Sequence, residues 1–530
     1  MGETMKDKKK YLWCTVSLII SILIFVAVGM NKRITFCDEI YTYMIVNSSN
    51  GAYQLAQGQW YTKEQTVDML GHTSGDGLMQ MVRNVKGDPH PPLYYGLVYI
   101  ASLIGGKNVS EWIGLSVNML MYSAAVLMVW LTIYRIFGRP AMAAAAAVVC
   151  AINVGLLSDA MLIRMYMQFT FFAMAFAYVT LLLYQEKDRT LNYILLGIIT
   201  AGGFLTQYYF SFIAIAFFVV WAIYNIVQKK YSRIAKYLAA MAGAAAVDTV
   251  VWHFWIGTLL SNNNSEAIKT NAMNFANIFN SMFRGMVTVQ LVIFQQWYIV
   301  GGIMALLIVA VTLMSRKVSL MYSGIRLYVG TLLAVVFCYA AIVYYLTPSH
   351  LMSGRYFYAA AVLELLLIAV CVCTLLQVYV TKAIGIKLSR VLRPATAAVL
   401  VVLELAMLTF GYGIDYYTDS KEYDCQREIL EQYADIPWIL CGGESWQMTA
   451  NFLDYLIPEK IMRVTTDTPY ESEPELESAD AFLLIAEGGE DNSLKDTGLY
   501  YYIGSTGRFA ESEFLMERNG LSYFIAYPVR

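Results

Sequence analysis

The sequence predicts a polytopic α-helical membrane protein of about 11 spans, followed by a small C-terminal α/β soluble domain. Of its 530 residues, 58% are hydrophobic and only 14% are charged, whereas soluble domains carry about 25% charged residues. The mean hydropathy is +0.51. Residues 414–530 hold 23 Asp and Glu against 8 Lys and Arg, while residues 1–413 hold 16 against 29. We therefore expect a basic membrane domain at 1–413 and an acidic extracytoplasmic domain at 414–530.

Long uncharged segments define the predicted spans. Residues 11–30 carry no charge, and a helix of about 20 residues crosses a hydrocarbon core of about 30 Å. We interpret them as an uncleaved anchor. The run 190–228 is long enough for two spans, and Thr206–Tyr209 predicts a tight hairpin within it. The uncharged runs that mark the predicted spans are 11–30, 112–134, 140–157, 165–185, 190–228 (two spans), 237–247, 286–314, 327–346, 356–363 and 394–403, and several of these spans extend past a single buried acid.

The distribution of cations predicts the orientation. If the N-terminus is cytoplasmic, the six segments on its side hold 19 Lys and Arg in 55 residues. The four loops on the other side hold 10 in 134 residues. Cytoplasmic loops of membrane proteins are enriched in Lys and Arg. We therefore expect a cytoplasmic N-terminus and an extracytoplasmic C-terminal domain.

This orientation requires that residues 91–106 do not cross the membrane. Pro91-Pro92 opens a helix readily, and Gly105-Gly106 closes it after too few residues to span comfortably. We expect an interfacial helix there, within an outer loop at 31–111 that carries juxtamembrane helices.

The C-terminal residues alternate between helical and strand patterns, which predicts an α/β domain. Helices are expected at 422–433 and 444–456, and strands at 437–441, 460–464, 481–486 and 521–527. Cys425 and Cys441 are the two cysteines in this domain. They would be able to form a disulfide if the domain faces an oxidising compartment.

Two motifs in the outer loop carry chemistry. Asp38-Glu39 follows the first span, and His90-Pro91-Pro92 follows about fifty residues later. Transfer of a sugar from a phosphate to a hydroxyl needs a base near the acceptor oxygen and cations near the departing phosphate. The alternative is that the two acids only cap a juxtamembrane helix.

These motifs resemble those of the GT-C superfamily of membrane glycosyltransferases, in the group of protein O-mannosyltransferases and aminoarabinose transferases (glycosyltransferase family 39-like). The resemblance covers roughly residues 1–375. The residues that carry it are Asp38-Glu39-Ile40-Tyr41, His90-Pro91-Pro92-Leu93-Tyr94-Tyr95, Arg164-Met165-Tyr166 and Arg355-Tyr356-Phe357.

The resemblance implies an inverting transferase whose donor is a polyprenyl-phosphate sugar. It implies that Asp38 is the base that activates the acceptor and that Glu39 orients acceptor or donor. The expected partners are this donor, a glycan, lipid or protein acceptor and membrane lipids, with no nucleic acid.

Donor binding is expected from a set of polar and aromatic residues near the outer ends of the spans. Arginine can hold a phosphate in two-point contact, but an arginine at a membrane edge can also snorkel to lipid headgroups. Tyrosines are also enriched in interfacial belts, and a histidine before two prolines can simply hold its loop. The expected donor-binding residues are His90, Arg164, Tyr166, Gln207, Tyr208 and Arg355, with Tyr209 as a further candidate for the sugar pocket.

A metal site is not expected. His72, Asp76, Asp88 and His90 share the outer loop, but their spacing is not diagnostic of a metal site.

Acids within the apolar segments support an alternative function. Asp248, Glu364 and Glu404 lie inside predicted spans, where a charge costs about 2.5 to 3.5 kcal/mol. They must face the bundle or a wet cavity, or be protonated. A transporter or flippase of a lipid-linked sugar could use such acids, although it would place its substrate site near the midplane. A polysaccharide polymerase or ligase is a third possibility, but it does not call for the acid pair with His-Pro-Pro.

Overall fold

The computed structural model divides the chain into two compact units, each described by itself. The first comprises residues 1–30, 88–94 and 115–415, and the second comprises 31–87, 95–114 and 416–530. The structure describes residues 2–34, 36–48, 55–71, 77–106, 109–185, 189–261, 278–321, 323–347, 352–380, 385–411, 413–415, 418–442, 446–464, 479–487 and 509–528.

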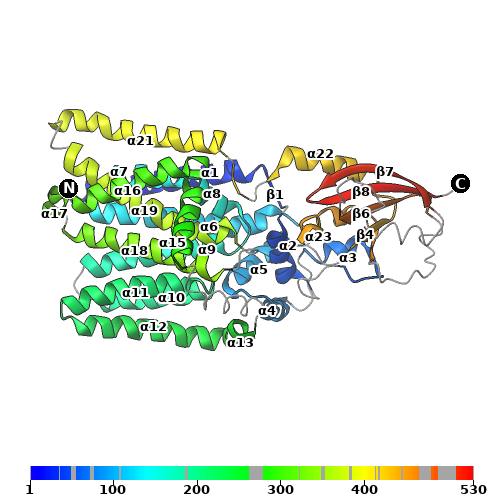
Figure 1. Cartoon of the computed structure of the whole chain (residues 1–530), viewed down its shortest axis with the longest axis horizontal. Helices are drawn as coiled ribbons and strands as arrows, with labels where there is room; N and C mark the ends of the chain where they lie inside the picture. Colours follow the sequence, from blue (N-terminus) through cyan, green and yellow to red (C-terminus); the bar gives the residue numbers. More distant parts are fainter. Residues whose placement is uncertain are drawn as a thin grey trace. The chain divides into compact units, whose positions relative to one another are not determined.

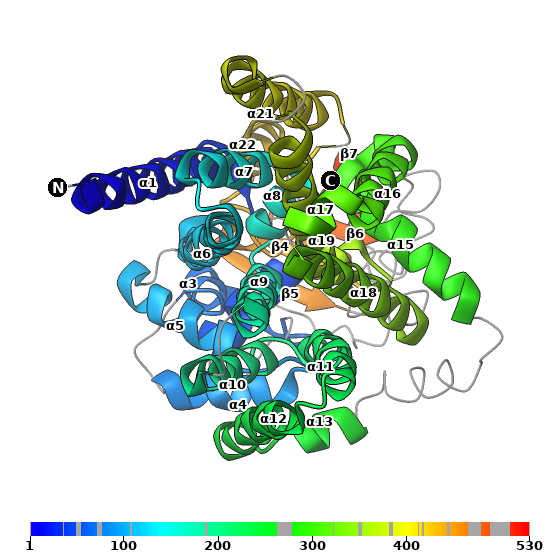
Figure 2. The same ribbon diagram turned by 90° about the vertical axis from the view of Figure 1, so that its left-hand side faces the viewer.

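The first unit is built from helices (Figure 1). They are α1 (Gly2–Gly29), α6 (Glu111–Phe137), α7 (Pro140–Ile152), α8 (Val154–Met161), α9 (Tyr166–Gln185), α10 (Thr190–Phe204), α11 (Phe210–Val227), α12 (Tyr231–Val251), α13 (Trp255–Ser261), α15 (Ile278–Phe294), α16 (Tyr298–Met314), α17 (Arg316–Met321), α18 (Ser323–Leu346), α19 (Tyr358–Leu375) and α21 (Gly385–Phe410). Helices α9, α10, α11 and α12 pack together, as Figure 2 shows.

Within the described residues, eight helices are long and apolar enough to cross a membrane, or nine if the bent pair α7–α8 is one span. Thr190–Phe204 and Pro394–Phe410 are apolar but shorter. The predicted multi-pass helical architecture is confirmed, and each predicted span coincides with at least one helix. Leu93–Gly105 (α5) is a separate apolar helix of 13 residues, or about 20 Å, as expected for residues 91–106.

Two predicted spans are broken by local backbone features. Helices α7 and α8 meet at an angle of 63°, and the Asn153 side chain at the break accepts from the Gly155 N–H at 3.0 Å. The predicted span 286–314 is two helices, α15 and α16, separated by a 3-10 turn that begins at Gln295 with φ +49°. Helix α8 also continues to Met161, into residues predicted to be a loop.

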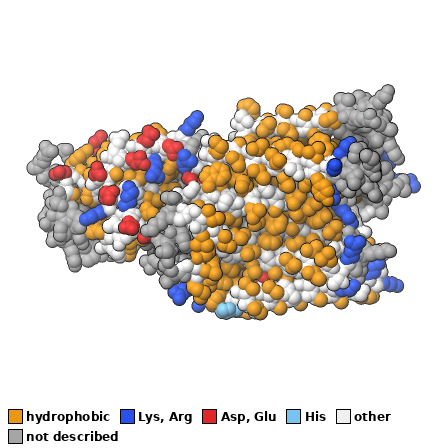
Figure 3. Space-filling model, turned by 180° about the vertical axis from the view of Figure 1, so that it is seen from behind, with side chains coloured by type: hydrophobic (Ala, Val, Ile, Leu, Met, Phe, Trp, Pro, Cys, Tyr) orange, Lys and Arg blue, Asp and Glu red, His pale blue; other side chains and the backbone are white. Residues whose placement is uncertain are grey.

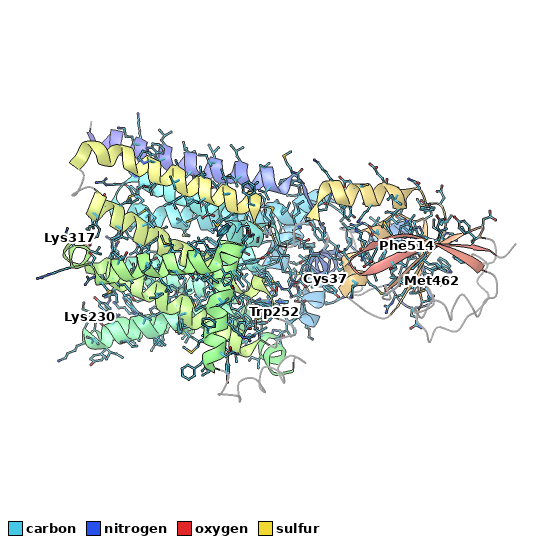
Figure 4. All side chains as sticks on the ribbon, turned by 45° about the horizontal axis from the view of Figure 1, so that its top comes forward. Cys37, Lys230, Trp252, Lys317, Met462 and Phe514 are labelled. Atoms are coloured by element: carbon cyan, nitrogen blue, oxygen red, sulfur yellow. The ribbon has the colours of Figure 1, made fainter. Side chains whose placement is uncertain are left out.

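The surface of the helical unit has the pattern of a membrane protein. Hydrophobic side chains cover the face shown in Figure 3, and Lys and Arg gather at one end. Lys230 and Lys317 lie at the same end of the bundle in Figure 4, and Trp252 lies toward the other. The predicted spans likewise place the two segments that contain Lys230 and Lys317 on one side of the membrane.

The second unit combines the outer loop with the C-terminal residues. Its loop helices are α2 (Cys37–Asn47), α3 (Lys63–Val67), α4 (Gly77–Gly87) and most of α5 (Leu93–Gly105). The predicted domain boundary at 414 falls beside the change of unit at Asp415. In contrast, most of the predicted outer loop 31–111 groups with the C-terminal residues.

Among the described residues, the second unit has a six-stranded sheet in the order β2-β5-β4-β6-β8-β7. Strands β5, β4 and β6 are parallel, and β2, β8 and β7 join antiparallel. The strands are β2 (Trp60–Thr62), β4 (Trp438–Cys441), β5 (Lys460–Val464), β6 (Phe482–Glu487), β7 (Phe509–Arg518) and β8 (Leu521–Pro528). Two short strands, β1 (Lys32–Arg33) and β3 (Thr418–Asp419), pair separately, and α22 (Ser420–Glu431) and α23 (Trp446–Ala450) complete the unit.

The small sheet domain is confirmed, with two strands that the sequence did not predict. The outer loop supplies β2, which pairs with β5, and β7 pairs with β8 as a hairpin. The predicted helix 444–456 is only the short α23 and a 3-10 turn at Asp454–Leu456. All eight cysteines lie in described residues and are free thiols, with Cys441 buried and Cys425 exposed.

Candidate functional site

The loop at residues 88–92, in the first unit, brings His90 onto Asp88. His90 Nδ1 lies 2.7 Å from Asp88 Oδ2, and the His90 backbone N–H donates to the same oxygen at 2.9 Å. An Arg164 guanidinium nitrogen lies 3.8 Å from Asp88 Oδ1 and 3.4 Å from His90 Nδ1. Two residues expected to bind the donor, His90 and Arg164, therefore share one carboxylate.

The charge of Asp88 is set by its two neighbours. Burial raises the pKa of the Asp88 carboxyl, but the charge and hydrogen bonds of His90 and the charge of Arg164 outweigh it and lower this pKa to about 2. Asp88 is then ionised at neutral pH and can only accept hydrogen bonds, so Nδ1 of His90 carries a proton. Nε2 is the ring nitrogen that remains for another group.

A buried asparagine that sequence reasoning missed fixes this cluster. Tyr94 Oη donates to Asn118 Oδ1 at 3.0 Å, and Asn118 Nδ2 donates to the carbonyls of Ala160 and Leu162 at 3.0 and 2.7 Å. Asn118 is completely buried on α6. It joins the His-Pro-Pro loop to the turn that carries Arg164.

The same loop is held to the α10–α11 hairpin. The Leu93 N–H donates to the Leu205 carbonyl at 3.0 Å. In the hairpin, Gln207 is buried, and Tyr208 Oη accepts from Trp252 Nε1 at 3.2 Å. Burial raises the pKa of Tyr208, and nearby Asp88 acts in the same direction. The predicted hairpin is confirmed, because α10 ends at Phe204 and α11 begins at Phe210.

An aromatic cluster joins three of the sequence motifs. The ring centroid of Tyr166 lies 6.0 Å from that of Tyr356 and 6.5 Å from that of Tyr358, both edge-on. Tyr209 lies 5.9 Å from Tyr356. The Arg355 guanidinium lies 5.4 Å from the Tyr356 ring centroid. The Arg-Met-Tyr, Arg-Tyr-Phe and hairpin motifs therefore meet within the first unit.

The acid pair lies at the start of α2, in the second unit, beside Cys37 (labelled in Figure 4). Glu39 is completely buried, and its Oε1 lies 2.9 Å from Lys32 Nζ, which is also buried. The Phe36 N–H points to Glu39 Oε2 at 3.5 Å. Asp38 is only half-buried. Asp38 is therefore the more exposed of the two acidic residues, and Lys32 is a partner that sequence reasoning missed.

Asp38 and Glu39 belong to one unit, whereas His90, Arg164, Tyr166, Gln207, Tyr208 and Arg355 belong to the other. The structure brings together residues within each set. His72 and Asp76 lie outside the described residues. In the part of the chain that is described, no group of three His, Cys, Asp or Glu could hold a metal ion.

The intramembrane acids are buried, and two of them accept hydrogen bonds from side-chain amides. Gln290 Nε2 donates to both carboxylate oxygens of Glu364 at 2.8 and 2.9 Å. Asn153, at the α7–α8 break, donates to Glu404 at 3.0 Å. Asp248 is buried on α12. Asp159, predicted in a loop, is instead completely buried at the end of α8, and Thr170 Oγ1 donates to it at 2.5 Å.

Comparison with known proteins gives a match of part of the chain to one family and a likeness of fold. Residues 89–255 match the family of dolichyl-phosphate-mannose-protein mannosyltransferases (PMT_2). The chain is similar to ArnT from Cupriavidus metallidurans, solved with undecaprenyl phosphate, at 13% identity and a TM-score of 0.52 over 97% of each chain.

The chain also resembles the oligosaccharyltransferase AglB from Archaeoglobus fulgidus, solved with an inhibitory peptide and a dolichol-phosphate. The identity is 13% and the TM-score 0.47, over 97% of this chain and 74% of AglB. No curated protein sequence matches the chain.

The predicted resemblance to GT-C membrane glycosyltransferases is confirmed by the family match and the ArnT-like fold. The matched range contains His90 and Arg164 but not Asp38. The particular residues of the acid pair therefore remain a prediction.

Proposed function

We propose that this protein is an inverting GT-C glycosyltransferase that moves one sugar from a polyprenyl phosphate to an acceptor outside the cytoplasm. The observation that carries the proposal is the Asp88–His90–Arg164 cluster, because two of its members, His90 and Arg164, lie in the region that matches a lipid-phosphate-dependent transferase family. ArnT, which has the same fold, was solved with a polyprenyl phosphate.

In this proposal, Arg164 and His90 hold the donor phosphate. The Arg164 side chain is only 4% exposed, and a guanidinium removed from water interacts strongly with a phosphate. Negative charge grows on the phosphate oxygen as the bond to the anomeric carbon breaks, and nearby cations stabilise that charge. Asp88 fixes the orientation of both residues. Arg355, beside Tyr356, is a second candidate for phosphate contact.

Asp38 acts as the general base. It takes the proton of the acceptor hydroxyl while the hydroxyl oxygen bonds to the anomeric carbon from the face opposite the phosphate, which leaves with the electrons of the broken bond. This displacement inverts the anomeric configuration. The buried Lys32–Glu39 pair supports a positioning role for Glu39, which holds the segment before α2 rather than touching substrate.

The experiment that tests this mechanism replaces the proposed base. Asp38→Asn should bind the donor normally but lose transfer by at least about a hundredfold, the effect of removing a general base. Glu64→Gln, at an exposed position in α3 of the same unit, is the matched control and should retain full activity. Near-normal turnover of purified Asp38→Asn would remove this residue from the mechanism.

The rival function as a flippase leads to a different outcome. It requires that an intramembrane acid such as Glu404 be essential while Asp38 and Arg164 tolerate substitution. The hydrogen bond from Asn153 to Glu404 instead supports a packing role at the helix break. Proton-driven movement of a lipid-linked sugar by the Asp38→Asn variant, without transfer, would favour the flippase.

A further inference from the structure

Asp415 is an acid that the function proposed above does not use. It is the last residue of the first unit. The residue as a whole is exposed, but its carboxyl is partly buried, and this burial raises its pKa. Tyr358 Oη donates to Asp415 Oδ2 at 3.3 Å. Among the described residues, Asp415 forms no ion pair, and its Oδ1 accepts no hydrogen bond. The carboxylate is therefore held at one oxygen and open at the other.

This carboxylate lies beside the aromatic cluster of the candidate site. Tyr358, which holds it, packs edge-on against Tyr166, two residues after Arg164. A Cβ added at Gly354 would lie 3.8 Å from Asp415 Oδ2. Gly354 begins the 3-10 turn that carries Arg355 and the half-buried Tyr356.

Anchoring of the backbone at this position does not explain the carboxylate. The Asp415 backbone N–H donates to Ser158 Oγ at 2.9 Å, and Gln295 donates to the Gly413 carbonyl. Both bonds use the backbone, so any residue at 415 could make them. A partly buried carboxylate needs hydrogen-bond partners, and Tyr358 supplies one of them.

We propose that Asp415 and the half-buried Tyr356 form a subsite for the sugar of the lipid-linked donor, an inference that rests on the proposed function. A carboxylate oxygen accepts hydrogen bonds from hydroxyl groups, and an aromatic ring offers an apolar surface to the C–H groups of a sugar. Asp415 Oδ1 receives a sugar hydroxyl while Oδ2 stays on Tyr358. The two residues then recognise the sugar and not the phosphate.

The test compares carriers with and without a sugar. The probes are undecaprenyl phosphate and its mannosyl, glucosyl, galactosyl and arabinosyl esters, with binding to the purified full-length protein measured by calorimetry. In the wild type, at least one ester should bind more tightly than the free carrier. Asp415→Ala should weaken binding of that ester about tenfold or more, and should leave binding of the sugar-free carrier unchanged.

Two further variants separate recognition from structure. Ser158→Ala removes the partner of the Asp415 backbone and should not change the preference for the ester. Gly354→Ala adds a methyl group in ordinary van der Waals contact with Asp415 Oδ2, the oxygen that stays on Tyr358, and should likewise leave the preference unchanged.

The possible failures are distinguishable. If the wild type binds neither the esters nor the free carrier, the proposed function fails. The subsite alone fails if both are bound and Asp415→Ala weakens them equally or not at all. It also fails if no ester is preferred to the free carrier, or if Ser158→Ala has the same effect as Asp415→Ala.

Discussion

Replacing Asp88 by asparagine tests whether the Asp88–His90–Arg164 cluster is held by charge. The pKa of Asp88 is lowered from 3.8 to about 2, which corresponds to about 2 kcal/mol of preference for the ionised form in the folded state. The Asp88→Asn variant would keep an oxygen for the hydrogen bonds from His90 but would lose the charge. We expect the free energy of unfolding to fall by about 2 kcal/mol at about pH 5 to 7.

The pH dependence follows from the sign of the pKa shift. Because the folded pKa lies below the unfolded value, the stabilisation is complete above the unfolded pKa and is lost as the pH falls toward about 2. The difference between wild type and Asp88→Asn should therefore be constant above about pH 5 and shrink progressively below about pH 4. Chemical unfolding of the purified protein in mixed micelles, followed by tryptophan fluorescence, measures this difference.

An exposed ion pair provides the control. Glu431→Gln breaks a pair with Arg427 in which both side chains are more than a third exposed, and such pairs contribute little to stability. If Asp88→Asn is no more destabilising than Glu431→Gln, or if its effect does not diminish in acid, the cluster is not held by charge. In that case, the orientation of Arg164 would need another cause.

Three other predictions concern donor binding, the acid pair and topology. Arg164→Ala should weaken donor binding more than Arg164→Lys, because lysine keeps the charge but lacks the two-point fork; equal affinities would place the phosphate elsewhere. Glu39→Gln should destabilise the protein by about 3 to 5 kcal/mol because the buried Lys32 ammonium loses its counter-carboxylate, while the double variant Lys32→Met/Glu39→Leu should recover much of this stability; a recovered but inactive double variant would show that Glu39 acts on substrate. In intact cells, an impermeant thiol reagent should label the native Cys425 but not Ser232→Cys in a Cys425→Ser background, and the reverse labelling would overturn the orientation.

The helical architecture could be predicted because the bilayer imposes apolar segments with few charges, and these recur along the sequence. The helix breaks could not, because a bend at Asn153 or Gln295 depends on one side chain or one backbone angle within an apolar run. Strand β2 was missed for a different reason. It is three residues long, and its pairing with β5 comes from a segment about four hundred residues away.

The candidate site was likewise predictable from the sequence only in part. Arg164 and His90 were predicted from motifs, and the structure places both on Asp88, which the sequence suggested only as a weak metal ligand. Lys32 and Asn118 gave no signal, because Lys32 acts through a buried ion pair with Glu39, and Asn118 acts through Tyr94 and two backbone carbonyls. Their roles depend on burial, which a single sequence does not reveal for isolated polar residues.

The amide of Asn118 couples the His-Pro-Pro motif to the Arg-Met-Tyr motif. It accepts from Tyr94, at the end of the His-Pro-Pro motif, and donates to two carbonyls of the chain leading to Arg164. A change at this one buried position would therefore disturb His90 and Arg164 together. The double variant Asn118→Ala/Arg164→Ala should consequently lose less transfer activity than the two single variants together, as expected for residues that share one network.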